Sequence, residues 1–367
     1  MKKNKVLFVA PGGGNGGIRS WAIGMLNTFN NEEYEFVHIG VAHRRSARNN
    51  NYSKRIIDGL LDLRDTKRAI AISLKENRDI SLMHITTSGG LGTFRDYVLA
   101  KYCKRHRIKT IMHCHYGCIS EDYTRHGIKN YFLRKTMRLY DQIWVLDSRS
   151  ERTLKSDPDL ANKVFVTPNP IKVPIIDNIP NKSYKNVAFI GNLIPSKGIY
   201  ELVEAITQCS EDTTLTIVGP GEESVVNHIR EIAGDLIDNR VKFVGRLPNN
   251  EAIELMKTMD IIALPTYYVS EAFPISILEA MSNGKMVIST RRAAINDMLT
   301  ALDGSECGYF VSEKSTNDIV DAIKWCQANS SLADERCRKA YQKVHSCYRE
   351  DIIHNLYRSL YTKALSE

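Results

Sequence analysis

The chain has 367 residues, which is too long for one ordinary hydrophobic core and suits two domains of roughly 170–190 residues each. With 43% hydrophobic and 25% charged residues, its composition excludes an intrinsically disordered chain. No stretch approaches the ~20 apolar residues of a membrane span, and the five-residue apolar run near the N-terminus is too short for a signal peptide. We therefore expect a cytoplasmic protein.

Charge is unevenly distributed along the chain. Residues 1–170 carry 29 Lys and Arg against 16 Asp and Glu, a net charge of +13, whereas the remainder carries 21 against 26, or −5. This asymmetry indicates an anionic partner for the first half, such as the inner face of the cell membrane; a basic surface without any partner explains it equally well. The basic clusters lack the interleaved aromatic residues of a nucleic-acid groove, so no nucleic acid is expected.

Short β-branched runs alternate with longer amphipathic stretches in the first half. The predicted helices include "SWAIGMLNTF" and "FRDYVLAKYCKRH". The predicted strands are 6–10, 36–42, 80–85, 110–115, 142–146 and 163–168. This alternation, with nearly continuous apolar strands, is typical of a parallel sheet covered on both faces.

A proline-rich segment, 168–185, is typical of a domain linker, and the alternation then resumes. The strands predicted in the second half are 186–191, 215–221, 241–245, 260–265, 286–290 and 308–311. From about residue 316 the chain is predicted to be mostly helical. The pattern predicts two doubly wound α/β domains, with ligands at the carboxyl ends of the strands.

The cysteines are scattered, and only Cys114 and Cys118 have a spacing that suits a metal. They flank His115 and follow His113, but no second pair follows, so we predict free thiols and no metal site.

A glycine-rich loop, "APGGGNGG", joins the first strand to the first helix. Gly12, Gly14 and Gly17 satisfy the G-x-G-x-x-G spacing of dinucleotide-binding folds. The acid that would hold a ribose after the second strand is missing, and Arg44 and Arg45 stand there instead, which leaves an NADP-dependent oxidoreductase as an alternative. Glycine amides at a helix N-terminus also suit a phosphate or a developing negative charge.

Two acids in "EAFPISILEA" flank a predicted helix start. Pro274 suits the first helical position, so Glu271 lies in the loop before the helix and Glu279 about a turn and a half inside. Free amides at the helix end suit oxyanions, and carboxylates suit pairs of hydroxyls, a combination that fits a diphosphate joined to sugars. Taken alone, the two acids are better explained as a solvated helix residue, Glu279, and a charge that stabilises the helix dipole, Glu271.

The segment "DIIALPTYYVSEAFPISILEAMSNGKMVIST" resembles the donor-binding signature of the retaining GT-B glycosyltransferases of family 4, also called group 1. "FIGNLIPSKGIYELVEAI", "LTIVGPGEE" and "VKFVGRLPNNE" resemble the family's preceding elements in order. The resemblance implies a GT-B fold: two Rossmann-like domains facing a central cleft, with a C-terminal helix crossing back to the first domain. The implied boundaries are 1–170 for an acceptor-binding domain, 183–348 for a donor-binding domain and 349–367 for the final helix.

The resemblance also implies roles for individual residues. Glu279 would hold the nucleotide ribose, Glu271 the donor sugar, and Lys197 the donor diphosphate. The family often has Arg where this chain has Asn192, a difference that weakens phosphate neutralisation. The further donor-binding candidates are Gly13, Gly14, Gly16, Gly17, Gly191, Gly219, Arg246, Ala272, Phe273, Pro274 and Ile275.

The acceptor side is expected at the end of strand 110–115. His113 and His115 lie on the same face of that strand; we interpret His113 as a core residue and His115 as functional. His115 would position a hydroxyl group, while Arg19, His113 and Tyr116 are the other acceptor-side candidates.

The implied activity is a retaining transfer of a sugar from a nucleotide-diphosphate donor, UDP first and GDP next, to a glycan or lipid-linked acceptor in bacterial surface polysaccharide synthesis such as capsule. Neither a metal nor another cofactor is expected, and the D-x-D at 157–159 is predicted to be a solvated turn. A catalytically silent GT-B-like binding protein is the second alternative, supported by Asn192 alone.

Overall fold

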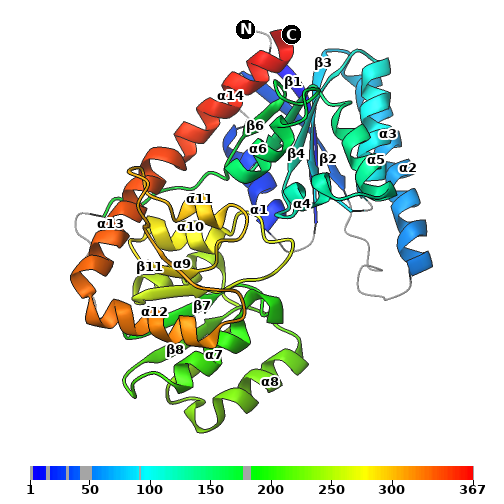
Figure 1. Ribbon diagram of the computed structural model, residues 1–367. Helices are drawn as coiled ribbons and strands as arrows, with labels where there is room; N and C mark the ends of the chain where they lie inside the picture. Colours follow the sequence, from blue (N-terminus) through cyan, green and yellow to red (C-terminus); the bar gives the residue numbers. More distant parts are fainter. Residues whose placement is uncertain are drawn as a thin grey trace. The chain divides into compact units, whose positions relative to one another are not determined.

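The computed structural model describes residues 3–13, 17–29, 33–41, 52–90, 92–176 and 183–366. The chain divides into two compact units: unit 1 comprises residues 1–170 and 353–367, and unit 2 comprises residues 171–352 (Figure 1). Each unit contains one six-stranded parallel sheet, so the predicted α/β fold with two doubly wound sheets is confirmed.

Unit 1 has the strand order β2-β1-β3-β4-β5-β6, and each predicted strand of the first half is found. These strands are β1 (Asn4–Pro11), β2 (Tyr34–Val41), β3 (Ile80–Thr87), β4 (Lys109–Cys114), β5 (Gln142–Val145) and β6 (Val164–Val166). Its helices are α1 (Gly17–Gly24), α2 (Tyr52–Glu76), α3 (Gly92–Arg105), α4 (Ile119–Thr124), α5 (Ile128–Met137) and α6 (Ser148–Lys155), with a π-helical turn over Met25–Phe29.

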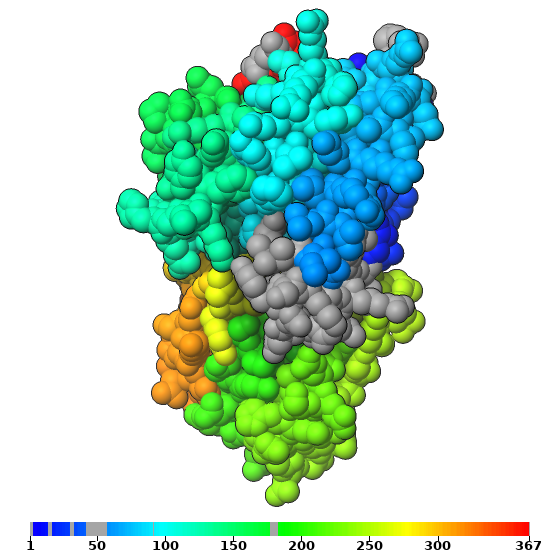
Figure 2. Space-filling view, turned by 90° about the vertical axis from the view of Figure 1, so that its right-hand side faces the viewer, coloured from blue at the N-terminus to red at the C-terminus, as the bar shows by residue number. Residues whose placement is uncertain are grey.

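The two faces of the first sheet bury different side chains because alternate residues of a strand point to opposite faces. In β1, Leu7 and Val9 join a core formed largely with α2, α3 and α5. Val6 and Phe8 join a second core formed with α1 and the last helix, α14 (Glu350–Ser366). The outer surfaces of α2 and α3 lie side by side in Figure 2.

Helix α14 packs on unit 1 through an aromatic face. Tyr357 and Tyr361, one turn apart, both stack on Trp144 of β5, with ring centroids 5.0 and 5.4 Å apart. All three side chains are fully buried. Burying such rings contributes roughly 2–3 kcal/mol each, which holds the C-terminal helix on the first sheet as the fold prediction required.

Unit 2 has the order β12-β11-β10-β7-β8-β9. Its strands are β7 (Asn186–Ile190), β8 (Thr214–Val218), β9 (Val241–Gly245), β10 (Ile261–Leu264), β11 (Met286–Ser289) and β12 (Tyr309–Phe310). Its helices are α7 (Ile199–Thr207), α8 (Glu223–Ala233), α9 (Asn249–Lys257), α10 (Ile275–Ser282), α11 (Ile295–Met298), α12 (Thr316–Ala328) and α13 (Ser330–Cys347).

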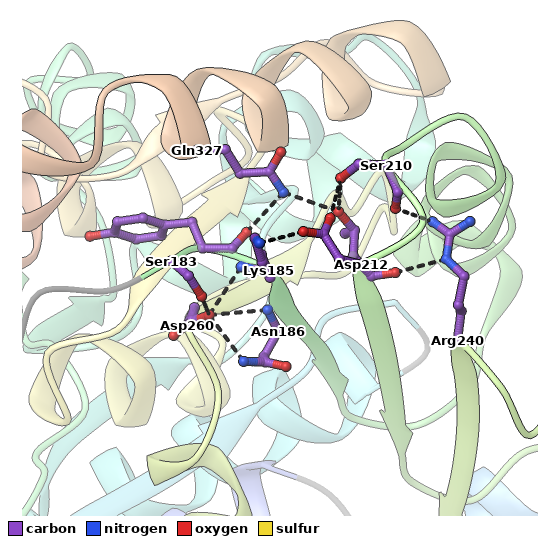
Figure 3. A network of polar contacts seen from close by, with 10 residues as sticks. Ser183, Lys185, Asn186, Ser210, Asp212, Arg240, Asp260 and Gln327 are labelled. Atoms are coloured by element: carbon purple, nitrogen blue, oxygen red, sulfur yellow. Dashed lines mark hydrogen bonds and ion pairs between the residues drawn. The ribbon is translucent and has the colours of Figure 1, made fainter.

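The amino edge of the second sheet is closed by a polar network (Figure 3). The carboxylate of Asp260, just before β10, accepts hydrogen bonds from the backbone amides of Lys185 and Asn186 at 3.0 and 3.1 Å. The guanidinium of Arg240, just before β9, donates to the carbonyl of Thr213 at 3.0 Å. Gln327 of α12 donates to the Thr213 hydroxyl at 3.0 Å. These bonds satisfy backbone groups at the starts of the strands and fix their register.

Two local predictions needed correction. Pro274 was predicted to be the first helical residue, but it is the N-cap of α10, with an extended backbone (ψ 116°), and the helix begins at Ile275. Proline suits the N-cap as well as the first helical position because it has no amide hydrogen that needs a partner. The D-x-D turn is not simply solvated. Asp157 accepts hydrogen bonds from the Tyr123 hydroxyl and from Arg138, while Asp159 is largely exposed.

The eight cysteines are free thiols, as predicted, and six of them are buried. Within the described part of the chain, no group of three or more His, Cys, Asp or Glu side chains is arranged to hold a metal ion. No helix among the described residues is long and apolar enough to cross a membrane.

Candidate functional site

The strand order of unit 2 marks its ligand-binding position. From β7 the chain proceeds outward through β8 and β9 on one side and, later, through β10, β11 and β12 on the other. Parallel sheets bind ligands at the carboxyl ends of the two strands where the order reverses, because the connections there diverge to opposite faces. Here those strands are β7 and β10.

Two predicted donor-site residues meet at this point although they are 74 positions apart in the sequence. Lys197 follows β7 and Glu271 follows β10, and their Nζ and Oε2 atoms lie 3.1 Å apart. The side chains are only 17% and 10% exposed, so water screens this pair poorly. The Thr266 hydroxyl donates to the same carboxylate oxygen at 3.4 Å.

The two loops that carry the pair are fastened together through their backbones. Tyr267 donates its amide hydrogen to the carbonyl of Ser196 at 2.8 Å. Gly198 has a left-handed backbone (φ +79°), and a Cβ atom there would lie 2.3 Å from the carbonyl oxygen of Pro265. Only glycine fits this close approach, which explains the Lys-Gly pair in "PSKG".

The loop before α10 is also held from the neighbouring strand β11. Arg292 donates from Nε to the carbonyl oxygen of Tyr268 at 2.8 Å and pairs with Glu313 at 2.6 Å. Ala294 donates its amide hydrogen to the carbonyl of Ala272 at 3.1 Å. These contacts define the path of the segment that contains Glu271, Ala272, Phe273, Pro274 and Ile275, all at the N-terminal end of α10.

Glu279 lies on α10, a little over one turn from its start, and is half-buried. Burial raises the pKa of its carboxyl group to about 7, although a hydrogen bond from the Asn249 side chain acts in the opposite direction. A carboxyl group at this pKa is present in both protonation states near neutral pH.

The remaining donor-site candidates of unit 2 lie at the ends of β7, β8 and β9. A Cβ atom at Gly219 would lie 1.8 Å from the carbonyl oxygen of Gly191, so the two backbones touch. Asn192 and Arg246 have exposed side chains in the loops that follow β7 and β9. The same sheet edge therefore presents Lys197, Glu271 and Arg246 with bare glycine backbone between them.

In unit 1, β4 ends in a buried histidine cluster. The His113 and His115 rings lie on the same side, with centroids 4.1 Å apart, as predicted. His113 Nδ1 hydrogen-bonds to His84 Nε2 of β3 at 3.2 Å, and its Nε2 lies 3.3 Å from the Thr167 hydroxyl. These bonds agree with the interpretation of His113 as a core residue.

His115 differs from His113 in its hydrogen bonding. It is 7% exposed, its ring contacts Trp21 at a centroid distance of 4.6 Å, and its Nε2 has no hydrogen-bond partner among the described residues. Burial lowers the pKa of the His115 imidazole to about 3, so the ring is neutral at physiological pH. A neutral imidazole with a spare nitrogen can accept or donate a hydrogen bond to a ligand hydroxyl.

Of the other candidates in unit 1, the structure describes only some. Tyr116 is buried and its ring covers Gly89. Its hydroxyl group and the Nε atom of Arg19 have no hydrogen-bond partner among the described residues. Gly13 is exposed after β1, and Gly17 begins α1. Gly14, Gly16, Arg44 and Arg45 lie outside the described residues.

Several residues of these sites were missed in the sequence. His84 and Trp21 belong to the histidine cluster, and Thr266 and Arg292 support Glu271. His84 carried a weak signal because it interrupts a predicted apolar strand. Thr266 and Arg292 carried none, since their role depends on which strands become neighbours.

Comparison with known proteins finds similarity that is concentrated in unit 2. Residues 175–344 match the family model described as glycosyl transferases group 1. The matched segment covers most of unit 2 and slightly less than half of the chain. A D-inositol 3-phosphate glycosyltransferase of Corynebacterium efficiens is 29% identical over 159 residues, 41% of this chain and 35% of that protein.

Two other proteins extend the comparison. An N,N'-diacetylbacillosaminyl-diphospho-undecaprenol alpha-1,3-N-acetylgalactosaminyltransferase of Campylobacter jejuni is 27% identical over 180 residues, 49% of this chain and 45% of that protein. Both alignments thus span less than half of the relative's own length. The Anabaena protein Alr3699/HepE, crystallised with UDP, superimposes with a TM-score of 0.73 at 15% identity over 98% of this chain and 100% of that one, so the chain has a GT-B fold.

Proposed function

We propose that the protein is a glycosyltransferase that moves a sugar from a nucleotide-diphosphate donor to a hydroxyl group of a glycan or lipid-linked acceptor. The observation that carries the proposal is the Lys197–Glu271 pair at the switch point of unit 2, between β7 and β10. UDP is the favoured donor nucleotide because the Anabaena neighbour was crystallised with UDP. GDP is the next candidate.

The barrier to sugar transfer is dominated by charge that develops on the departing diphosphate and on the sugar ring. A preformed cation at a poorly hydrated sheet edge stabilises that charge without reorganising. In this proposal Lys197 turns from Glu271 to the diphosphate, Glu271 accepts hydrogen bonds from the donor sugar, and the first-turn amides of α10 add positive dipole ends. Glu279 holds the ribose hydroxyls.

Several finer features belong to the same proposal. Transfer retains the configuration of the sugar, the departing diphosphate takes the acceptor proton, and no metal or other cofactor is required. His115 of unit 1 positions a hydroxyl group of the acceptor or the sugar. A role in bacterial surface polysaccharide synthesis is supported by the lipid-diphosphate acceptor in the name of the Campylobacter relative. The basic charge of residues 1–170 supports peripheral contact with anionic membranes.

The first experiment measures nucleotide binding and turnover. Calorimetry and donor hydrolysis with UDP-, GDP- and ADP-sugars are compared for the wild type and for Lys197→Met and Glu271→Gln. We expect Lys197→Met to lower turnover about 10²–10³-fold, the usual effect of removing one group that stabilises transition-state charge.

The matched control is another Lys–Glu pair of the same unit. Lys257 and Glu254 form an exposed ion pair of 2.6 Å on α9, and Lys257→Met should leave both binding and turnover unchanged. Binding of NADP but of no nucleotide sugar would replace the proposal with the oxidoreductase alternative. Nucleotide-sugar binding without turnover on any acceptor would favour a silent binding protein, which Asn192 in place of arginine supports.

A further inference from the structure

The sugar-transfer step itself assigns no role to the excess positive charge of residues 1–170, and part of this charge lies at a cavity of unit 1. This cavity of about 640 Å³ is lined by Lys109, Asp141, Lys155, Ala161, Asn162, Lys163, Val164, Phe165 and Lys363. We propose that it binds a phosphate group, carried by a soluble phosphate compound or by a lipid headgroup.

The cavity lies at the opposite edge of the sheet from the histidine cluster. Lys109 is the first residue of β4, and Asp141 and Lys163 directly precede β5 and β6. Because the strands are parallel and adjacent, these three side chains come together at the amino edge. The site is therefore separate from the carboxyl edge where His115 lies.

Four lysines and a single carboxylate line the cavity, and that carboxylate is already engaged. Oδ2 of Asp141 accepts hydrogen bonds from the amide and the hydroxyl of Thr110, both at 2.8 Å. Neither Lys109 nor Lys163 forms an ion pair with any residue that the structure describes. The lining thus retains an excess of positive charge, which a doubly charged anion would neutralise.

The wall of the cavity is formed partly by the last helix. Lys363 of α14 lies over the ring of Phe165, with Nζ 4.7 Å from the centroid. Lys155, at the end of α6, pairs with Glu151 at 2.7 Å on the exposed side of its helix. A phosphate held between Lys109, Lys163 and Lys363 would link the sheet edge to α14 and so stabilise unit 1. Lysine suits this task because its ammonium group donates three hydrogen bonds.

The test measures the stability of unit 1 in the complete chain. Trp21 and Trp144 belong to unit 1 and Trp325 to unit 2, so a Trp325→Phe background makes tryptophan fluorescence report unit 1. Sodium pyrophosphate at 10 mM should raise the thermal midpoint by about 2–5 °C more than sodium chloride of equal ionic strength. The Lys109→Gln/Lys163→Gln double variant should lose at least half of that increase.

The control variant carries the same change of charge elsewhere on unit 1. Lys104 and Lys135 are exposed on α3 and α5, and Lys104→Gln/Lys135→Gln should keep the full increase. A second arm measures sedimentation with vesicles of phosphatidylglycerol and phosphatidylcholine against phosphatidylcholine alone. A response to pyrophosphate identifies a soluble phosphate, and a response confined to the anionic vesicles identifies a lipid headgroup. Equal responses of the two double variants, or no response in either arm, would overturn the proposal, and neither result depends on transferase activity.

Discussion

The carboxyl edges of the two sheets differ in the residues that form them. In unit 2 the edge consists of glycine backbone in contact with backbone, a charged Lys197–Glu271 pair and a half-buried Glu279. In unit 1 the end of β4 carries imidazole rings packed against Trp21, and burial keeps His115 uncharged at neutral pH. The charged groups beside it, Arg95 and Asp96, pair with each other at the end of β3. The difference supports the proposal that unit 2 holds a charged ligand, whereas the end of β4 in unit 1 is nearly dry and offers a few polar atoms without partners among the described residues.

The largest effect is expected where the backbones of unit 2 touch. In Gly219→Ala the new Cβ would collide with the carbonyl of Gly191, and the left-handed backbone (φ +141°) would be strained as well. We expect unit 2 to lose about 3–5 kcal/mol of its free energy of unfolding, measured by urea denaturation with Trp325 fluorescence. Unit 1, followed through Trp21 and Trp144, should keep its stability.

A matched glycine separates collision from backbone strain. Gly304 also has a positive φ (+82°) but open space around its Cβ position, so Gly304→Ala should cost only about 1 kcal/mol. If the two variants lost equal stability, the close contact between the β7 and β8 loops would not be what holds this edge together.

The free energy of unfolding of unit 1 should decrease strongly as the pH falls. Burial lowers the pKa values of His84, His113 and His115 in the folded state, and charge on His115 lowers those of the other two further. Below about pH 6.5 the unfolded chain therefore binds more protons than the folded one, and stability falls as the pH falls. Three such imidazoles give a slope of up to about 4 kcal/mol per pH unit.

Urea denaturation of the Trp325→Phe variant between pH 7.5 and 5 measures this slope. Asp96, whose pKa burial raises, acts in the opposite direction, but only near the acid end where carboxyl groups titrate. Unit 2 is the comparison: its His228 and His345 are exposed, and burial raises the pKa of its Glu279 carboxyl group to about 7. Folded unit 2 therefore takes up a proton before the unfolded chain does, and its stability, read from Trp325 in a Trp21→Phe/Trp144→Phe variant, should rise as the pH falls. A flat pH dependence for unit 1 would mean that the histidine cluster takes up protons without unfolding.

Much of the fold could be predicted from the sequence, but the composition of the sites could be predicted only in part. All twelve strands were recognised because buried parallel strands are nearly continuous apolar runs ended by glycine or polar residues. The sequence also contained Lys197 and Glu271 as candidates, since each lies in a motif. Their contact depends on β7 and β10 being neighbours, and strand order is not encoded in local periodicity.

The same limit explains the residues that were missed. His84 reaches His113 because β3 and β4 are adjacent, with His84 paired to Ile111 in the register. Arg292 reaches Tyr268 from the loop after β11. Each contact joins segments that only the tertiary structure brings together. The start of α10 at Ile275 instead of Pro274, by contrast, depends only on the local backbone of the first turn.

The smallest predicted effect is a pH dependence of nucleotide binding in unit 2. Burial raises the pKa of Glu279 to about 7, so its carboxyl group loses its proton as the pH rises from 6 to 8. A carboxylate accepts hydrogen bonds from a pair of ribose hydroxyls better than a protonated acid does, because charge-assisted bonds are roughly twice as strong. The affinity for UDP should therefore increase about 3–10-fold over this range.

Calorimetry with UDP at pH 6, 7 and 8 checks this expectation, and Glu279→Gln supplies the comparison because its amide does not titrate. The variant should bind UDP with nearly constant affinity, close to that of the wild type at pH 6. Glu231, exposed on α8, gives the control substitution Glu231→Gln, which should reproduce the wild-type pH dependence. If Glu279→Gln kept the full increase, the titrating group would be another one, and the ribose would have to be held by something other than the carboxylate of α10.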